Sequence, residues 1–418
     1  MTKLKTLTGL VVAVCLNWAA PAHADVVSDW NAVTMMYVNV GNPAAVPPIP
    51  IGRAGPPGFL DIALVHAAIH DAVQAIEGRF EPYYYSDLTK RGVGSPAAAV
   101  AAAAHRVLVL LYPGRQGTLD AFYADYLTSN GLVGDPGLAI GDAAAVALHT
   151  FQYRALIPLP NYFGHTNVGQ WRSPVPMAFL FMAFVEPFTL NRVSQFRPPP
   201  PPPLNSVKYF REYEEVKARG NANAHPNSET DVARFWSGNF GAQFNGAMRQ
   251  IANAQGLSVG DSARMFALAN IAAADTGMAV WESKYFYNFW RPITAIQEGD
   301  SDGIARTEGD VTWAPLLGTP PYPDYVSGAN GFTGVFTGML ELFFGTDQMN
   351  FSVTNLNPLL IETERFYARF SQAAEEVVDA RILLGIHFRT ADVEARQLGN
   401  RIAHWTFQKF LRPLPGSE

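Results

Sequence analysis

Apolar residues recur every three to four positions along most of this chain, and the strict alternation expected of half-buried strands is scarce. A period of about 3.6 residues is that of an amphipathic helix. The pattern predicts about eight helices, over residues 59–76, 97–111, 119–128, 140–154, 261–289, 328–344, 361–384 and 393–410. We therefore expect an all-α protein built from helical bundles.

A segment of different composition separates two blocks of predicted helices. Residues 155–205 are rich in proline, phenylalanine and asparagine, and residues 198–203 are six consecutive prolines. Such a run favours the extended polyproline conformation, either as a stiff crossover packed on the surface or as a ligand for a partner's aromatic groove. The crossover is the favoured interpretation. It divides the chain into an N-terminal half, residues 25–205, and a C-terminal half, residues 206–418.

The first 24 residues have the pattern of a secretory signal peptide. Lys3 and Lys5 precede an apolar run over residues 10–16, and small residues at 22 and 24 fit a cleavage point before Asp25. The run is shorter than the roughly 20 residues that a membrane anchor needs. We therefore expect an exported protein, periplasmic or secreted. Its only cysteine, Cys15, would leave with the signal peptide, so stability would come from a large core and not from disulfides.

The charge of the predicted mature chain limits its partners. Removing two lysines with the signal peptide leaves 28 basic against 36 acidic residues, a net charge of −8. A negative chain is a poor general partner for nucleic acid or an anionic membrane, although a local cationic pocket is still compatible with it. No segment after residue 24 is expected to be long and apolar enough to span a membrane. The expected partners are small molecules, and a homo-oligomer is compatible with the sequence.

Three clusters carry candidate chemistry, and the first contains two cations among aromatic residues. Lys284 and Arg291 are seven residues apart, so on a helix they lie on nearly the same face, about 10 Å apart in rise. Pro292 disfavours helix at Arg291 and predicts a bend there. Burying two cations is costly without an anion. Solvated surface cations are an equally weighted alternative for this cluster alone.

The second cluster is a predicted helix start after two turn-forming prolines. Ser327 is a good N-cap, and free N–H groups at Gly328 suit an oxyanion of phosphate shape. Gly334 and Gly338 continue at helical spacing. For these two glycines we expect a packing role, because small residues let a second helix approach closely.

The third cluster pairs an arginine with a histidine. Arg381 offers a fork of donors for an oxyanion, and His387 suits a nucleophile toward phosphorus or a ligand of a metal oxyanion. On a straight helix six residues place the two side chains about 120° apart, so they would not converge. A break near Gly385 would bring them together.

In this order and spacing the three clusters resemble the vanadium haloperoxidase and type 2 phosphatidic acid phosphatase superfamily, in its bacterial haloperoxidase-like branch. The residues that carry the resemblance are Lys284, Arg291, Pro292, Ser327, Gly328, Arg381 and His387, with residues 29–31 and 65–73 as further similar segments. The resemblance implies two four-helix bundles. It also implies that Lys284, Arg291 and Arg381 neutralise vanadate or phosphate, that Ser327 and the Gly328 amide bind its oxygens, and that His387 coordinates vanadium or attacks phosphorus.

Several positions depart from the family pattern. Val326 replaces a proline and Ala380 replaces a serine, while Ala391 stands where an aspartate that orients the histidine is expected, with Asp392 one position late. The most consequential change is Ala329, which replaces a second histidine that serves as acid and base. General acid–base catalysis is typically worth about 10² to 10⁴-fold in rate. The adjacent Asn330 donates hydrogen bonds but no proton.

A second pair of histidines lies outside these motifs. His66 and His70 are four residues apart on one helix face. A structural role is the favoured interpretation of this pair.

Three functions follow from this pattern. The first is a haloperoxidase-like oxidoreductase with vanadate as cofactor, in which Trp290, Tyr322 and Asn330 line a pocket for a halide or organic substrate. The second is a phosphomonoesterase that needs no cofactor and forms a phosphohistidine at His387, best with good leaving groups. The third is an oxyanion-binding protein with impaired catalysis.

Overall fold

The computed structural model describes residues 25–38, 55–152, 159–223, 227–355, 357 and 359–416. The predicted signal peptide lies outside the described residues. Helices dominate the described part, as the sequence predicted, and two short strands form one antiparallel sheet. The fold is therefore helical, with bundles as its main architecture.

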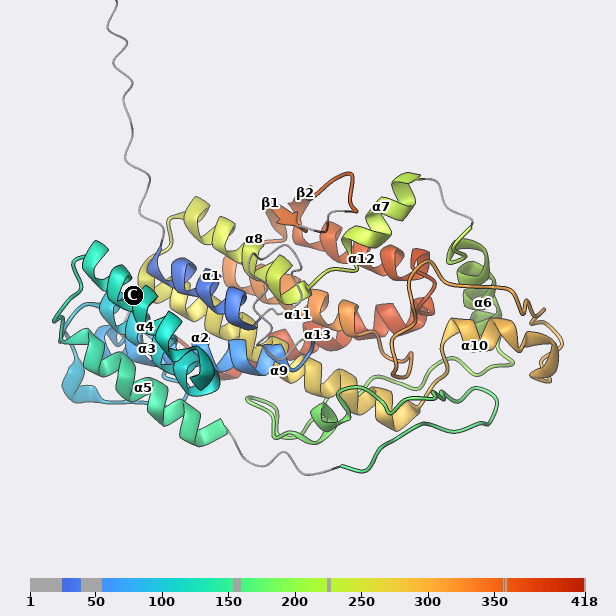
Figure 1. The fold of residues 1–418 in the computed structure, drawn as a ribbon, viewed down its shortest axis with the longest axis horizontal. Helices are drawn as coiled ribbons and strands as arrows, with labels where there is room; N and C mark the ends of the chain where they lie inside the picture. The colour runs from blue at the N-terminus through green and yellow to red at the C-terminus, as the bar shows by residue number, and fades with distance from the viewer. Residues whose placement is uncertain are drawn as a thin grey trace, which may run out of the picture.

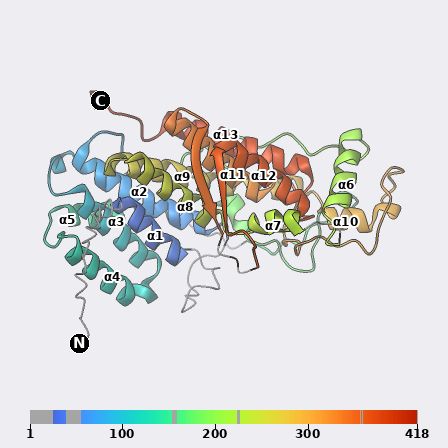
Figure 2. The same cartoon turned by 90° about the horizontal axis from the view of Figure 1, so that it is seen from above.

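The helices lie in two groups that are arranged end to end (Figure 1). The N-terminal group holds α1 (Val26–Val38), α2 (Gly58–Glu77), α3 (Pro96–Leu111), α4 (Gln116–Ser129) and α5 (Gly137–Gln152). The remaining helices are α6 (Val207–Arg219), α7 (Asn227–Phe235), α8 (Phe240–Gln255), α9 (Val259–Tyr287), α10 (Pro292–Gln297), α11 (Gly328–Phe344), α12 (Phe370–Leu383) and α13 (Arg389–Lys409). The view from above shows the same division, with α6 and α10 at the end far from α5 (Figure 2).

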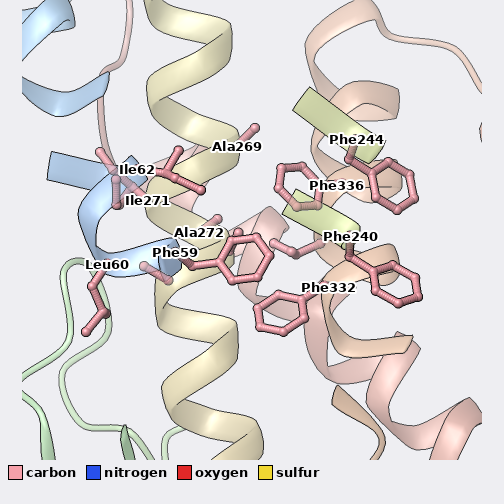
Figure 3. Close-up of a cluster of buried hydrophobic side chains, with 14 of the residues drawn as sticks. Phe59, Leu60, Ile62, Phe240, Phe244, Ala269, Ile271, Ala272, Phe332 and Phe336 are labelled. Atoms are coloured by element: carbon pink, nitrogen blue, oxygen red, sulfur yellow. The ribbon is translucent and has the colours of Figure 1, made fainter. Parts of the chain in front are cut away.

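Helix α9 connects the two groups. It packs on α2 in the first group and on α11 and α13 in the second, and its 29 residues span about 43 Å. It is buried on all sides over most of its length, with alanines where neighbouring helices approach. Figure 3 shows Ala269, Ile271 and Ala272 of this helix beside the apolar side chains of its neighbours.

An aromatic cluster joins α2, α8 and α11 beside α9 (Figure 3). The rings of Phe59 and Phe332 stack with their centroids 4.0 Å apart, and those of Phe244 and Phe336 stack at 5.2 Å. Stacked aromatic pairs contribute more than their buried area alone. Because Phe332 lies in the second turn of α11, this cluster fixes the start of α11 against the N-terminal group.

One predicted helix is wrong at its N-terminal end. The sequence predicted a helix over residues 361–384, but β1 (Gln348–Thr354) pairs with β2 (Glu364–Arg369) in an antiparallel hairpin, and α12 begins only at Phe370. Tyr367 packs on Phe351 across the hairpin and donates a hydrogen bond to Glu376 of α12. These long-range contacts override the helical periodicity of the segment. Helices α1, α6, α7, α8 and α10 were not predicted.

Helix α2 contradicts the expectation that no segment after residue 24 is long and apolar enough to span a membrane. By length and composition its 20 residues would suffice to cross a membrane, with a mean hydropathy of 1.4 over its apolar window. All of that window is buried inside the protein. The place of α2 in the core is sufficient to explain its apolar composition.

The proline-rich crossover lies against the C-terminal group. The carbonyl oxygens of Pro198 and Pro199 accept hydrogen bonds from the hydroxyls of Tyr287 and Tyr325, at 2.6 and 2.5 Å. A polyproline segment has no internal hydrogen bonds, so its carbonyls are free to accept from neighbours. These two hydrogen bonds therefore hold the start of the proline run against the protein near the end of α9.

Helices α11 and α13 approach closely through glycines, as the spacing of Gly334 and Gly338 predicted. A Cβ atom at Gly334 would lie 2.2 Å from the carbonyl oxygen of Arg396, and one at Gly338 would lie 3.0 Å from the Asn400 side chain. Backbone cannot move away as a flexible side chain can. Gly334 therefore sets how closely the two helices pack.

Replacing Gly334 with alanine is expected to destabilise the protein by about 1–3 kcal/mol, the usual cost of overpacking a core. Gly246→Ala is the matched control in α8, because a Cβ there meets only the end of the Arg249 side chain at 3.6 Å. That change should stabilise by about 0.5–1 kcal/mol, since alanine is the better helix former. Urea unfolding of both variants measures the difference. Equal stability of the two variants would contradict the close-approach argument.

Candidate oxyanion site

The end of α9 places both cations of the first cluster inside the protein. Asn288 takes a left-handed conformation with φ 45° and ends the helix, and Arg291 is extended, with φ −87° and ψ 155°, immediately before Pro292 opens α10. The side chain of Lys284 is 0% exposed and that of Arg291 is 1% exposed. The alternative that they are solvated surface cations is therefore wrong.

Backbone carbonyls of one loop accept hydrogen bonds from both cations. Lys284 Nζ donates to the carbonyl oxygens of Pro323 and Asp324, at 2.7 and 3.0 Å, and Arg291 Nε donates to that of Tyr322 at 2.9 Å. The Tyr322 ring centroid lies 5.0 Å from Lys284 Nζ and 5.0 Å from Arg291 Cζ. Tyr322 thus borders the cations, whereas the side chain of Trp290 is fully enclosed in the core.

Ser327 and Gly328 begin α11 beside this loop. Ser327 is the N-cap of the helix. Its hydroxyl accepts from the backbone N–H of Asn330 at 3.5 Å, and its own backbone N–H donates to the carbonyl oxygen of Ala391 at 2.9 Å. Gly328 is the first residue of the helix, where the N–H has no partner within the helix. The side chain of Ala329, where the family pattern has a histidine, is 8% exposed.

Arg381 and His387 lie on either side of a break, as the sequence required for them to converge. Helix α12 ends at Leu383, and Gly385 has φ +73°, where a Cβ would lie 2.4 Å from the carbonyl oxygen of Gly220. The chain then turns, and α13 begins at Arg389. His387 reaches Arg291, whose Nη1 lies 3.2 Å from Nε2 and 3.5 Å from Nδ1.

The carboxylate that contacts His387 comes from an unexpected place. Asp324 Oδ1 lies 2.7 Å from His387 Nδ1 and 3.9 Å from Arg291 Nη1, and the Asp324 side chain is 0% exposed. Asp324 was not among the residues predicted for this site. The sequence carried a signal for it, because an acidic residue three positions before Ser327 is a natural partner for the cations of the first cluster.

Asp392 has another partner. Asn330 Nδ2 donates to Asp392 Oδ1 at 2.8 Å, and both side chains are fully buried. Asn330 is thus held inside the protein by Asp392, and its place in a substrate pocket stays a prediction. The carboxyl group in contact with His387 is that of Asp324. Asp392 therefore does not take the place of the aspartate that the family pattern has at position 391.

Burial dominates the electrostatics of the site. Burial and the neighbouring Arg291 hold the pKa of Lys284 well below its usual value, and burial together with the three cations lowers the pKa of His387. Both effects favour the neutral form of the His387 imidazole. Burial raises the pKa of Asp392 to about 7, an effect that the Ser327 hydroxyl and the charge of Arg381 oppose.

Several buried polar atoms at the site have no hydrogen-bond partner among the described residues. They include the donors Arg291 Nη2 and Arg381 Nε and the acceptors Asp324 Oδ2, Asn330 Oδ1 and Asp392 Oδ2. An unpaired buried donor costs free energy comparable to a lost hydrogen bond, and more when it is charged. Free guanidinium donors beside a buried lysine and the start of a helix fit the chemistry of a tetrahedral oxyanion such as vanadate or phosphate.

The histidine pair of α2 lies apart from these groups. His66 Nε2 lies 2.8 Å from Asn31 Nδ2 and its ring stacks on Phe266, while His70 Nε2 lies 3.0 Å from the carbonyl oxygen of Glu81. Burial lowers the pKa of His66 to about 3 and that of His70 to about 4. Both are neutral core residues, in agreement with the structural interpretation.

Comparison with known proteins agrees with the resemblance that the motifs carry. Residues 264–416, which include every candidate residue of the site, match the family model for the second helical-bundle domain of VCPO. Vanadium chloroperoxidase of Curvularia inaequalis is 34% identical over 94 residues, which are 20% of this chain and 15% of that protein. The matched segment is therefore a small part of that relative.

Two solved structures share the fold over most of their length. The first bacterial vanadium-dependent iodoperoxidase superimposes with a TM-score of 0.76 at 22% identity, over 94% of this chain and 97% of that one. A holo-type bacterial vanadium-dependent chloroperoxidase gives 0.66 at 17% identity, over 84% and 90%. The resemblance seen in the motifs is thus confirmed: the chain has the fold of the vanadium haloperoxidase structures, and its residues 264–416 match the second helical-bundle domain of VCPO.

Proposed function

We propose that this protein binds vanadate at the site around His387 and acts as a haloperoxidase-like oxidoreductase on halide or a small organic substrate. The observation that carries the proposal is the set of buried cations whose guanidinium atoms, Arg291 Nη2 and Arg381 Nε, lack partners among the described residues. Charged donors of this kind remain buried at low cost only when an anion compensates them.

Each residue has a distinct part in holding the anion. Lys284, Arg291 and Arg381 would neutralise its charge, the Ser327 hydroxyl and the Gly328 N–H would donate to its oxygens, and His387 would offer a ring nitrogen to vanadium. Bound vanadate would supply the Lewis acidity that activates peroxide for transfer of oxygen to a halide. The protein's contribution is to bind and orient the oxyanion and to keep it from bulk water.

Proton transfer is the weak part of the proposed reaction. Ala329 has no proton to give, and Asn330 is committed to Asp392. A site with an acid–base residue would gain about 10² to 10⁴-fold in rate from it. We therefore expect slow turnover with tight oxyanion binding.

A phosphomonoesterase is the second candidate, favoured by the state of His387. A neutral imidazole with a carboxylate at Nδ1 is a competent nucleophile through Nε2. Attack on phosphorus would form an N–P bond and break the ester P–O bond, and the leaving oxygen would depart with its electron pair. Without an acid at position 329, aryl phosphates with good leaving groups would react, and alkyl phosphates would not.

Calorimetric titration of the purified protein with vanadate, followed by an iodination and bromination assay with peroxide, tests the first proposal. Stoichiometric binding with vanadate-dependent halogenation is the expected result, and His387→Ala should abolish the activity. Vanadate-inhibited hydrolysis of an aryl phosphate without peroxide would favour the phosphatase. Binding with neither activity would leave an oxyanion-binding protein. No binding of vanadate or phosphate would contradict the proposed site.

Loss of the buried ammonium should weaken oxyanion binding whichever reaction is correct. For Lys284→Met we expect affinity for vanadate and for phosphate to fall about 10- to 100-fold, because a hydrogen bond to a charged group contributes about 1.5–3 kcal/mol. Lys208→Met is the matched control, since Lys208 is exposed. The same titration measures all variants. Unchanged affinity in both Lys284→Met and Arg381→Met would show that the clusters do not form one site.

Restoring the family's histidine should restore its chemistry. In Ala329→His we expect vanadate-dependent halogenation to rise about 10²-fold or more, with vanadate affinity changed only a few-fold, because the new side chain adds a proton donor and acceptor. Ala329→Gln is the control, since glutamine fills similar space without a transferable proton. Equal rates in the two variants would contradict this account of the slow step.

A further inference from the structure

We infer that Asp324 is the positioning residue of the oxyanion site: it keeps the proton of His387 on Nδ1, so that Nε2 presents its lone pair to the anion. The inference rests on the proposed function, because it concerns how His387 meets the oxyanion. It goes beyond that function in assigning the orientation of His387 to a residue of a different segment from the one that the family pattern uses.

The tautomer follows from what each neighbour of the ring is able to do. A guanidinium only donates hydrogen bonds. Arg291 Nη1 lies at nearly equal distances from the two ring nitrogens, 3.2 Å from Nε2 and 3.5 Å from Nδ1, so it lies off the lone-pair direction of either and does not select a tautomer. Asp324 Oδ1 lies 2.7 Å from Nδ1, at hydrogen-bond distance. A carboxyl oxygen that accepts from Nδ1–H places the ring proton on Nδ1 and leaves the lone pair of the neutral imidazole on Nε2.

The main chain of Asp324 is fixed at both of its polar atoms. Its N–H donates to the carbonyl oxygen of Phe289 at 3.0 Å, and its carbonyl oxygen accepts from Lys284 Nζ at 3.0 Å. The preceding carbonyl, that of Pro323, accepts from the same ammonium at 2.7 Å. The residues that would bind the anion therefore also hold the loop that aims the carboxylate.

Burial raises the pKa of Asp324 well above its usual value, an effect that the charges of Arg291 and Lys284 oppose. Position 391 holds an alanine, and Asp392 Oδ1 accepts from Asn330. Among the described residues, Asp324 is the carboxylate within hydrogen-bond distance of His387.

Removing Asp324 would leave Nδ1 without its acceptor. The proton could then move to Nε2, where it would occupy the position of the lone pair. Residues that orient a metal-ligating histidine are typically worth about 10- to 100-fold in affinity. A carboxamide at position 324 would still accept from Nδ1, so the shape of the side chain matters more than its charge.

The experiment compares Asp324→Ala, Asp324→Asn and the control Asp71→Asn, which alters a buried carboxylate of α2 that accepts from the amides of residues 83–85. ¹⁵N NMR of protein labelled with ¹⁵N-histidine reports the His387 tautomer. The His387 signals are identified as those that are absent from the spectrum of His387→Gln. Calorimetry with vanadate and with inorganic phosphate gives affinities.

We expect an Nδ1–H tautomer in the wild type and in Asp324→Asn, with affinities within a few-fold of each other. In Asp324→Ala we expect loss of that tautomer and a 10- to 100-fold weaker affinity. The control should match the wild type. An Nε2–H tautomer in the wild type would overturn the inference. Because this result needs no variant, the test remains decisive even if Asp324→Ala does not fold. An Asp324→Asn variant as weak as Asp324→Ala would also overturn the inference. If the wild type binds neither anion, the proposed function fails, whereas the tautomer comparison still decides the role of Asp324.

Discussion

The burial of Lys284 and Arg291 is the constraint on which the rest of the C-terminal group depends. A buried cation must be compensated, and here backbone carbonyls compensate it first. The acceptors are residues 322–324, before α11, and Ile386, before α13. The hydrogen bonds of Lys284 and Arg291 therefore hold two loops in place, and each loop carries residues of the proposed oxyanion site.

The helices that carry these loops are held rigidly. Gly334 lets α11 meet the backbone of α13, and the stacking of Phe59 on Phe332 holds α11 against α2 (Figure 3). Side chains on such packed elements keep their geometry better than side chains on free loops. Partner-free guanidinium atoms are therefore held in place by the fold, ready for an anion.

In the proposed site, anion binding and proton transfer depend on different residues. The binding groups come from α9, from the start of α11 and from the two ends of the break at Gly385, whereas the acid–base function of the family pattern depends on position 329 alone. Alanine at position 329, in place of the histidine of the family pattern, leaves the cations, the helix start and His387 in place. A single substitution thus changes the expected rate far more than the expected affinity.

What the sequence determined by itself is local. Periodicity defined the helices from α2 to α5 and α9, α11 and α13, Pro292 set the bend at Arg291, Ser327 capped α11, and Gly385 supplied the break. These features depend on a residue and its near neighbours, which a pattern records. The hairpin of residues 348–369 and the pairing of Asn330 with Asp392 depended on distant contacts. The contact between Asp324 and His387 joins residues 63 positions apart, and only the tertiary structure decides it, because no local preference specifies which loops the buried cations draw together.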